Sequence, residues 1–118
     1  MALKIMFVNP NLKYFTVPNL GLAYVMSKAE QRYQVKLLDL TFHAREVRQH
    51  IARVTSGYSP DIVAFSVNSF TLDDGLTIAR LIRERFRHAK FIWGGIHPTL
   101  FPEEMINHPL VDGICIGE

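Results

Sequence analysis

The sequence predicts a small α/β domain built on an open, all-parallel sheet of five strands. Two observations predict it. Short apolar runs rich in β-branched residues alternate strictly with longer stretches of helical periodicity, and 118 residues, 48% of them hydrophobic, suffice for one compact core. Such alternation favours parallel pairing through right-handed crossovers, with helices on both faces of the sheet. We therefore expect a single domain over residues 1–118.

Each predicted strand is an apolar run too short to be a helix. The first is followed directly by Asn9, the third ends at Ser66, and the fourth is followed directly by Gly94 and Gly95. The fifth contains the chain's one cysteine, Cys115, which we expect to be buried and unreactive. In chain order the strands cover residues 3–8, 35–40, 62–66, 91–93 and 113–116.

The stretches between the strands have helical spacing. The first helix opens beside Pro18, a residue favoured in a first turn. The third begins after Thr71, whose hydroxyl can cap free N–H groups, and Asp73 and Asp74 favour the positive end of the helix. Its arginines, Arg83 among them, fall outside the apolar stripe, so we expect them on a solvated face. In chain order the helices cover residues 19–32, 44–56, 72–86 and 100–107.

Composition excludes several classes of function. The formal charge is +2, from 13 basic and 11 acidic residues, and most of the basic residues are scattered, which argues against a nucleic-acid partner. One cysteine permits neither an internal disulfide nor an iron–sulfur cluster held by this chain alone. No apolar run approaches the roughly 20 residues needed to cross a bilayer, and no secretory leader is evident. We expect a cytoplasmic protein without a membrane partner.

In open parallel sheets, ligands bind at the carboxyl ends of the strands. The loop after the first strand lacks the G-x-G-x-x-G turn of a dinucleotide site, and no G-x-x-x-x-G-K phosphate loop occurs. A phosphorelay domain is disfavoured, because Asn9, Ser66 and Gly117 stand where its acids and lysine would be. The paired Gly94 and Gly95 indicate either a large group close to the backbone or a tight turn with positive φ.

Five segments carry a resemblance to a known family: KIMFVNP, PNLGLAYVMSKAE, VAFSVNSFT, FIWGGIHPTLFPEE and VDGICIGE. On this alternating frame the chain resembles the amino-terminal cobalamin-binding domain of cobalamin-dependent radical-SAM enzymes, the methyltransferase and anaerobic cyclase-like group. The resemblance implies a flavodoxin-like (Rossmann-like) doubly wound sheet with strand order 2-1-3-4-5. It also implies cobalamin as the cofactor, bound base-off, with its nucleotide tail running past Ser66, Gly94 and Gly95.

The same resemblance implies a following radical-SAM domain in cis, which would hold the iron–sulfur cluster and S-adenosylmethionine. The C-x-x-x-C-x-x-C motif of such a domain is not in this chain. The chain would then be the amino-terminal fragment of a longer enzyme of methyl transfer or related radical chemistry, and would not be catalytic alone. An apolar face beyond Cys115 would make self-association of the fragment a further expectation.

The resemblance assigns cofactor binding to residues at the strand ends. Two positions depart from the family pattern: Asn68 stands at the leucine place of S-x-L, and the loop after the first strand has no histidine to ligate cobalt from below. His97 is an alternative metal ligand. The full expected set is Asn9, Pro10, Ser66, Val67, Asn68, Thr71, Gly94, Gly95, Ile96, His97, Gly117 and Glu118.

Two other hypotheses remain open. The domain could be a degenerate docking or structural module of the same architecture that no longer binds cobalamin, in which case side chains such as Phe70, Ile96 or Leu100 should fill the tail's groove. It could instead be a stand-alone α/β enzyme or regulator for another nucleotide-like ligand. That third hypothesis requires His97, Ser66 and Asn9 to converge on one pocket.

Overall fold

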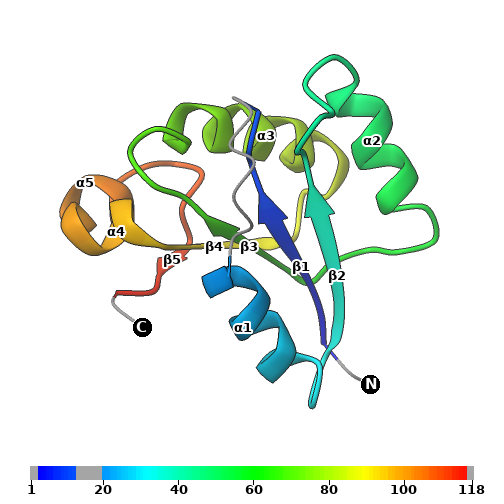
Figure 1. Ribbon diagram of the computed structural model, residues 1–118, viewed down its shortest axis with the longest axis horizontal. Helices are drawn as coiled ribbons and strands as arrows, with labels where there is room; N and C mark the ends of the chain where they lie inside the picture. The colour runs from blue at the N-terminus through cyan, green and yellow to red at the C-terminus, as the bar shows by residue number, and fades with distance from the viewer. Residues whose placement is uncertain (1–2, 13–19, 117–118) are drawn as a thin grey trace.

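The computed structural model describes residues 3–12 and 20–116 and contains one sheet of five parallel strands (Figure 1). The strands lie in the order β2-β1-β3-β4-β5, which confirms the predicted fold and topology. Their bounds are β1 Lys4–Asn9, β2 Gln34–Asp39, β3 Ile62–Ser66, β4 Lys90–Gly94 and β5 Gly113–Ile114.

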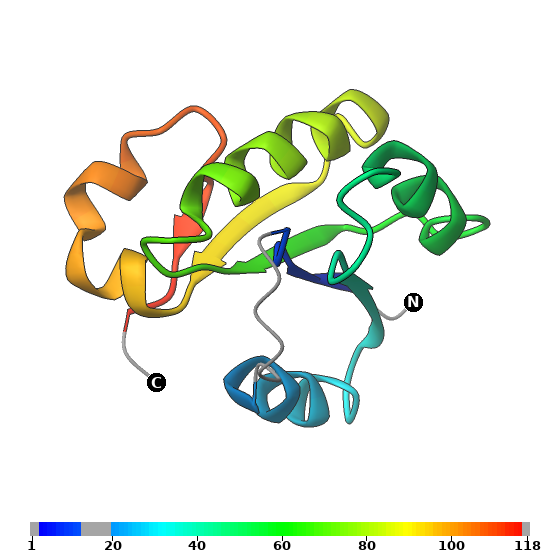
Figure 2. The ribbon, with the colours of Figure 1, turned by 45° about the horizontal axis from the view of Figure 1, so that its top comes forward.

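The helices form two layers around this sheet. Figures 1 and 2 show α1 on one face and α2 and α3 on the other, with α4 and α5 beside the β4–β5 end. α1 packs against β1 and β2. In the described part of the chain, the β3 and β4 portion of that face is therefore left without a covering helix (Figure 2). The helices are α1 Leu20–Ala29, α2 Val47–Val54, α3 Leu72–Arg85, α4 Ile96–Leu100 and α5 Pro102–Ile106.

The main core lies between the sheet and α3. Alternate residues of the central strands are fully buried there, as the two-residue period of a strand requires. Phe65 and Trp93 stack with ring centroids 4.1 Å apart, and the Trp93 indole N–H donates to the Leu110 carbonyl at 2.9 Å. Gly75 lets α3 approach closely, because a Cβ there would lie 3.1 Å from the Trp93 ring. The strand residues of this core are Met6, Val8, Val63, Phe65, Phe91 and Trp93.

The carboxyl-terminal third departs from the sequence expectation. The predicted helix over 100–107 is replaced by two short helices, α4 and α5, separated at Phe101. Pro98 sits in the first turn of α4, where its missing N–H is not needed, so GGIHPT continues into a helix rather than a loop. β5 ends at Ile114, so Cys115 lies beyond the strand and is exposed; the prediction of a buried cysteine was wrong.

Arg83 also differs from its predicted solvated role. Its guanidinium donates to the carbonyls of Arg87 at 3.0 Å and Ala89 at 2.7 Å, and reaches the Asp112 carboxylate at 3.4 Å. It lies 3.9 Å over the Phe91 ring. Asp112 in turn accepts the Phe91 backbone N–H at 2.7 Å. Arg83 thus connects the end of α3 to the beginnings of β4 and β5.

Among the described residues, no helix has both the length and the apolar character that a membrane span requires.

Candidate functional site

A groove of about 880 Å³ lies on the α1 face of the sheet, at the carboxyl ends of the strands. This is the sheet edge where open parallel folds bind ligands. The lining residues of the groove lie on α1, on β1, β3 and β4, and in the segments that follow β1, β3, β4 and β5. The local sequence produces it because the strand residues that point this way are small or polar at the strand ends.

Two rows of side chains form the floor. Strand pairing aligns Phe7 with Ala64 and Ala64 with Ile92, and all three line the groove; we call them the inner row. Two residues further along the same strands are Asn9, Ser66 and Gly94, which also line it; we call them the outer row. Ser66 pairs with Gly94. Because side chains alternate along a strand, both rows face the same side. The inner row is apolar, and the outer row is polar or lacks a side chain.

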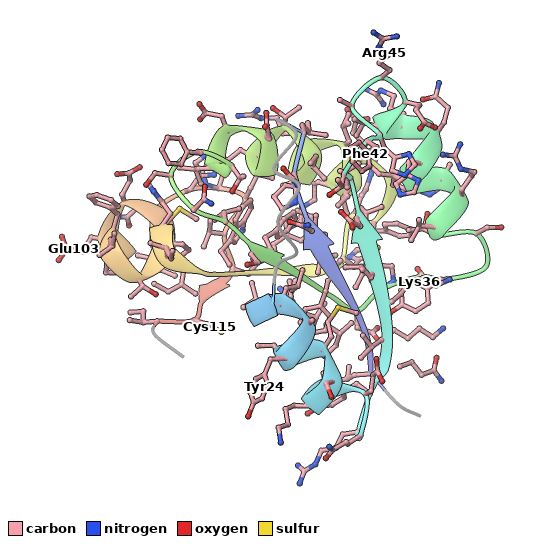
Figure 3. The ribbon with its side chains drawn as sticks, viewed as in Figure 1. Tyr24, Lys36, Phe42, Arg45, Glu103 and Cys115 are labelled. Atoms are coloured by element: carbon pink, nitrogen blue, oxygen red, sulfur yellow. The ribbon has the colours of Figure 1, made fainter. Side chains whose placement is uncertain are left out.

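The walls come from three segments of the chain. α1 supplies one wall, and the loops after β3 and β4 supply another. Cys115 closes the β5 side, and Figure 3 shows Cys115 and Tyr24 on the same side of the sheet. The wall residues are Gly21, Leu22, Tyr24 and Val25 on α1, Val67, Asn68, Thr71, Gly95 and Ile96 in the loop regions, and Cys115.

The two adjacent glycines have different roles. Gly95 has φ +101°, and a Cβ there would lie 2.6 Å from the Val67 carbonyl oxygen. The two loops meet at this point, since the Val67 N–H donates to the Gly94 carbonyl at 3.0 Å and the His97 N–H to the Val67 carbonyl at 3.2 Å. A Cβ on Gly94 would meet only the Cys115 Cβ, at 3.6 Å, and the Phe65 carbonyl oxygen, at 3.9 Å. Gly95 is therefore required by the turn, whereas Gly94 leaves the floor open.

A chain of hydrogen bonds fixes the polar end beside β1 and β2. One Asp39 carboxylate oxygen accepts the Thr41 hydroxyl at 2.7 Å, the Thr41 N–H at 3.0 Å and the Asn9 amide at 3.3 Å. The Thr41 hydroxyl oxygen accepts the amide of Asn11 at 3.2 Å. Asn11 is buried and lines the groove. The side chains of Asn9 and Asn11 are thus oriented by a carboxylate outside the groove.

The loop after β3 is held by Asn68. Its side-chain oxygen accepts the N–H groups of Phe70 at 2.8 Å and Thr71 at 3.0 Å, while its own N–H donates to the Thr71 hydroxyl at 3.0 Å. The predicted cap of α3 is thus different in detail: Thr71 is the N-cap residue but makes no side-chain cap bond to the helix. An asparagine at this place shapes the loop, which gives a structural reason for the departure from S-x-L.

His97 is not among the residues that line the groove. It belongs to α4 and its side chain is buried, with Nδ1 3.0 Å from the Ser69 hydroxyl and the ring centroid 4.9 Å from that of Phe101. Its Nε2 is buried without a hydrogen-bond partner, 3.7 Å from Glu104. Asn9 and Ser66 share the groove but His97 does not join them, so the pocket required by the third hypothesis does not form. The described residues contain no cluster of three metal-ligating side chains.

The described lining residues include no Asp, Glu, Lys, Arg or His. A cluster of interacting ionisable groups lies elsewhere, on and before α2, where hydrogen bonds from Arg53 and His43 lower the pKa of Glu46 to about 2. Burial and the nearby His43 lower the pKa of His50, whose ring stacks on that of His43 at 3.7 Å. Neither the Glu46 carboxyl nor the His50 imidazole lines the groove.

Most of the predicted site residues meet in this groove: Asn9, Ser66, Val67, Asn68, Thr71, Gly94, Gly95 and Ile96. Pro10 is fully buried and packs toward α3, near Gly75. Gly117 and Glu118 lie outside the described residues. Sequence reasoning missed the inner row, although Phe7, Ala64 and Ile92 each stand two residues before a predicted site residue. It also missed Asn11, Phe65, Cys115 and the α1 wall.

Comparison with known proteins gives two kinds of relative. The chain is 31% identical over 109 residues to "Uncharacterized methyltransferase PH0819" of Pyrococcus horikoshii, a match covering 87% of this chain and 22% of that protein. Its fold matches the radical S-adenosylmethionine methyltransferase TsrM of Kitasatospora setae, in a structure with cobalamin and a 4Fe–4S cluster bound. That match has a TM-score of 0.77 and 22% identity, and covers 90% of this chain and 22% of that one.

A second TsrM structure, with tryptophan substrate and a SAM analogue (aza-SAM) bound, matches with a TM-score of 0.73 and 22% identity. It covers 84% of this chain and 20% of that one. At this identity the structural matches establish the fold. The chain thus spans only about a fifth of the length of these relatives.

The family itself is established by the sequence. A family model described as the B12 binding domain matches residues 13–118, which is most of the chain. It includes the Ser66 and Gly94–Gly95 segments on which the predicted resemblance depends, and that prediction is confirmed. The chain belongs to the B12-binding domain family.

Proposed function

We propose that this chain holds cobalamin base-off, with the corrin ring over the carboxyl ends of the strands and the nucleotide tail in the groove. The observation that carries the proposal is a groove left open at Gly94, whose described lining residues include no Asp, Glu, Lys, Arg or His, in a member of the B12-binding family. A Cβ at Gly94 would lie at an ordinary contact distance from Cys115. The missing side chain therefore widens the floor where a tail would pass.

The groove residues have distinct tasks in this proposal. Ser66 and the side chains of Asn9 and Asn11 face the polar part of the tail, and Asp39 orients the two asparagines through the hydrogen bonds described above. Gly94 leaves the floor open for the tail, and Gly95 permits the turn beside it. Bound cobalamin supplies a cobalt centre that can accept and donate a methyl group.

We further propose that the chain is the cobalamin module of a longer radical-SAM polypeptide. The relatives support this, since the chain covers 22% of a named methyltransferase and 22% of a radical-SAM methyltransferase that binds cobalamin and a 4Fe–4S cluster. The reaction would then depend on the cluster and S-adenosylmethionine of a following domain. In keeping with this, the groove lacks a charged acid–base pair among its described lining residues.

The alternative of a degenerate docking module has less support. It requires groove-filling side chains, yet Phe70, Ile96 and Leu100 are 70%, 64% and 63% exposed. Phe70 and Leu100 are not among the lining residues, and Ile96 lines the groove with most of its surface exposed.

The visible spectrum of cobalamin bound to the purified chain at neutral pH tests the coordination. We expect a base-off spectrum, because the tail is drawn away from cobalt into the groove. A base-on spectrum in the bound state would contradict the proposal, since the dimethylbenzimidazole would then remain on cobalt and outside the groove.

A further inference from the structure

At the far end of the groove, the described floor residues and the α1 residues Leu22 and Val25 have no side chain that can form a hydrogen bond with a ligand. The inner row consists of Phe7, Ala64 and Ile92, and α1 adds Leu22 and Val25. The backbone groups of the central strands at this level are engaged in the parallel ladders between β1, β3 and β4. A ligand group seated on the inner row therefore rests on the apolar side chains of Phe7, Ala64 and Ile92.

The polar side chains that the described strands and the loops after them contribute to the groove lie nearer its mouth. Asn9 and Ser66 belong to the outer row, and Asn68 and Thr71 belong to the loop beyond it. A long ligand that enters from the carboxyl edge passes these polar groups first. Its terminal group travels furthest and comes to lie against the inner row.

We infer that the inner row makes this site selective for cobamides whose lower base is apolar. The inference rests on the proposed seating of the nucleotide tail. In cobalamin the base at the end of the tail is a dimethylated benzimidazole, whereas other cobamides carry adenine. The ring nitrogens and amino group of adenine would be buried on Phe7, Ala64 and Ile92 without partners, while two methyl groups are favoured there.

The size of the selectivity follows from the cost of an unpaired buried polar group. We expect cobalamin to bind about 10- to 100-fold more tightly than the adenine-containing cobamide. The corrin ring and the sugar–phosphate part of the two ligands are the same, so their contacts with the outer row cancel in this comparison.

The test is an equilibrium titration of the chain with three corrinoids: cobalamin, the adenine cobamide and cobinamide, which lacks the nucleotide tail. The inference predicts the affinity order cobalamin, adenine cobamide, cobinamide. Equal or tighter binding of the adenine cobamide, with cobinamide still weak, would overturn the selectivity but leave the proposed function intact. Cobinamide binding as tightly as the other two would overturn the proposed function itself, and the inference with it.

A matched pair of variants locates the selectivity. Ala64→Ser introduces one hydroxyl into the inner row, and Ala52→Ser makes the same change on α2, away from the groove. We expect Ala64→Ser to lower the ratio of cobalamin to adenine-cobamide affinity at least threefold and Ala52→Ser to leave the ratio unchanged. An unchanged ratio in Ala64→Ser would show that the inner row does not contact the base. The wild-type comparison stands independently if Ala64→Ser fails to fold.

Discussion

Gly95 and Val67 meet so closely that a Cβ on Gly95 would lie 2.6 Å from the Val67 carbonyl oxygen. Real Cβ atoms do not approach a backbone oxygen this closely, and the φ of +101° is unfavourable for any other residue. We predict that Gly95→Ala lowers the free energy of unfolding by about 2–3 kcal/mol, measured by urea denaturation.

The control for this prediction is Gly57→Ala. Gly57 also has a positive φ, +68°, but a Cβ there meets no atom within 4 Å. Gly57→Ala should therefore lower the free energy of unfolding by about 1 kcal/mol, which is the cost of the backbone conformation alone. Equal losses in the two variants would show that the contact with Val67 contributes nothing.

Thr41 connects Asp39 to the groove, so we predict that Thr41→Val weakens cobalamin binding about 3- to 10-fold. Valine keeps the shape but removes the hydroxyl that donates to Asp39 at 2.7 Å and accepts from Asn11 at 3.2 Å. The loss corresponds to one or two net hydrogen bonds. Thr77→Val, which removes an exposed hydroxyl from α3, should bind cobalamin as the wild type does. Unaltered affinity in Thr41→Val would mean that Asn11 does not contact the cofactor.

Cys115 offers a built-in reporter, because it is exposed, lines the groove and is the chain's one cysteine. We predict that saturating cobalamin slows its reaction with a thiol-specific disulfide reagent at least tenfold. The rate of thiolate release, followed by absorbance, measures the protection. Gly94→Val is the control, since it should react equally fast with and without cobalamin. The same rate for wild type in both conditions would place the cofactor away from the β5 side of the groove.

Arg83 stabilises the junction of α3, β4 and β5, and we predict that Arg83→Met lowers the free energy of unfolding by about 1–3 kcal/mol. Methionine keeps apolar contact with Phe91 but leaves the carbonyls of Arg87 and Ala89 without this donor. Arg80→Met, on an exposed position of the same helix, should change stability by less than about 0.5 kcal/mol. Thermal or urea unfolding of both variants distinguishes the roles, and equal small effects would contradict the prediction.

The fold was predictable because its rules are local and repeated. Apolar runs with polar or glycine ends defined the strands near Asn9, Ser66 and Gly94, and strict alternation with helices defined the parallel sheet. The outer row followed from the same rule, because the ends of parallel strands share one edge. The resemblance then supplied the order of the strands, which the structure confirms.

The features of the site and core that the sequence did not predict depend on the pairing of strands and on packing between elements. That Phe7, Ala64 and Ile92 form one row follows only from the register between β1, β3 and β4. The exposure of Cys115 depends on β5 ending at Ile114, and the burial of His97 depends on α4, which the Gly95–Val67 contact positions. The role of Arg83 required the return of the chain at Asp112. The spacing of residues in the sequence does not reveal any of these contacts between separate elements.

The measurement that tests the central claim most directly is calorimetric titration of the wild-type chain and of Gly94→Val with hydroxocobalamin. A valine side chain at position 94 would occupy the outer row, yet its Cβ makes only ordinary contacts, the nearest 3.6 Å from Cys115. We predict saturable one-to-one binding to the wild type and a loss of at least 100-fold in Gly94→Val, with unchanged circular dichroism. Equal binding by the two folded proteins would contradict the account, because cobalamin would then be held somewhere other than this groove.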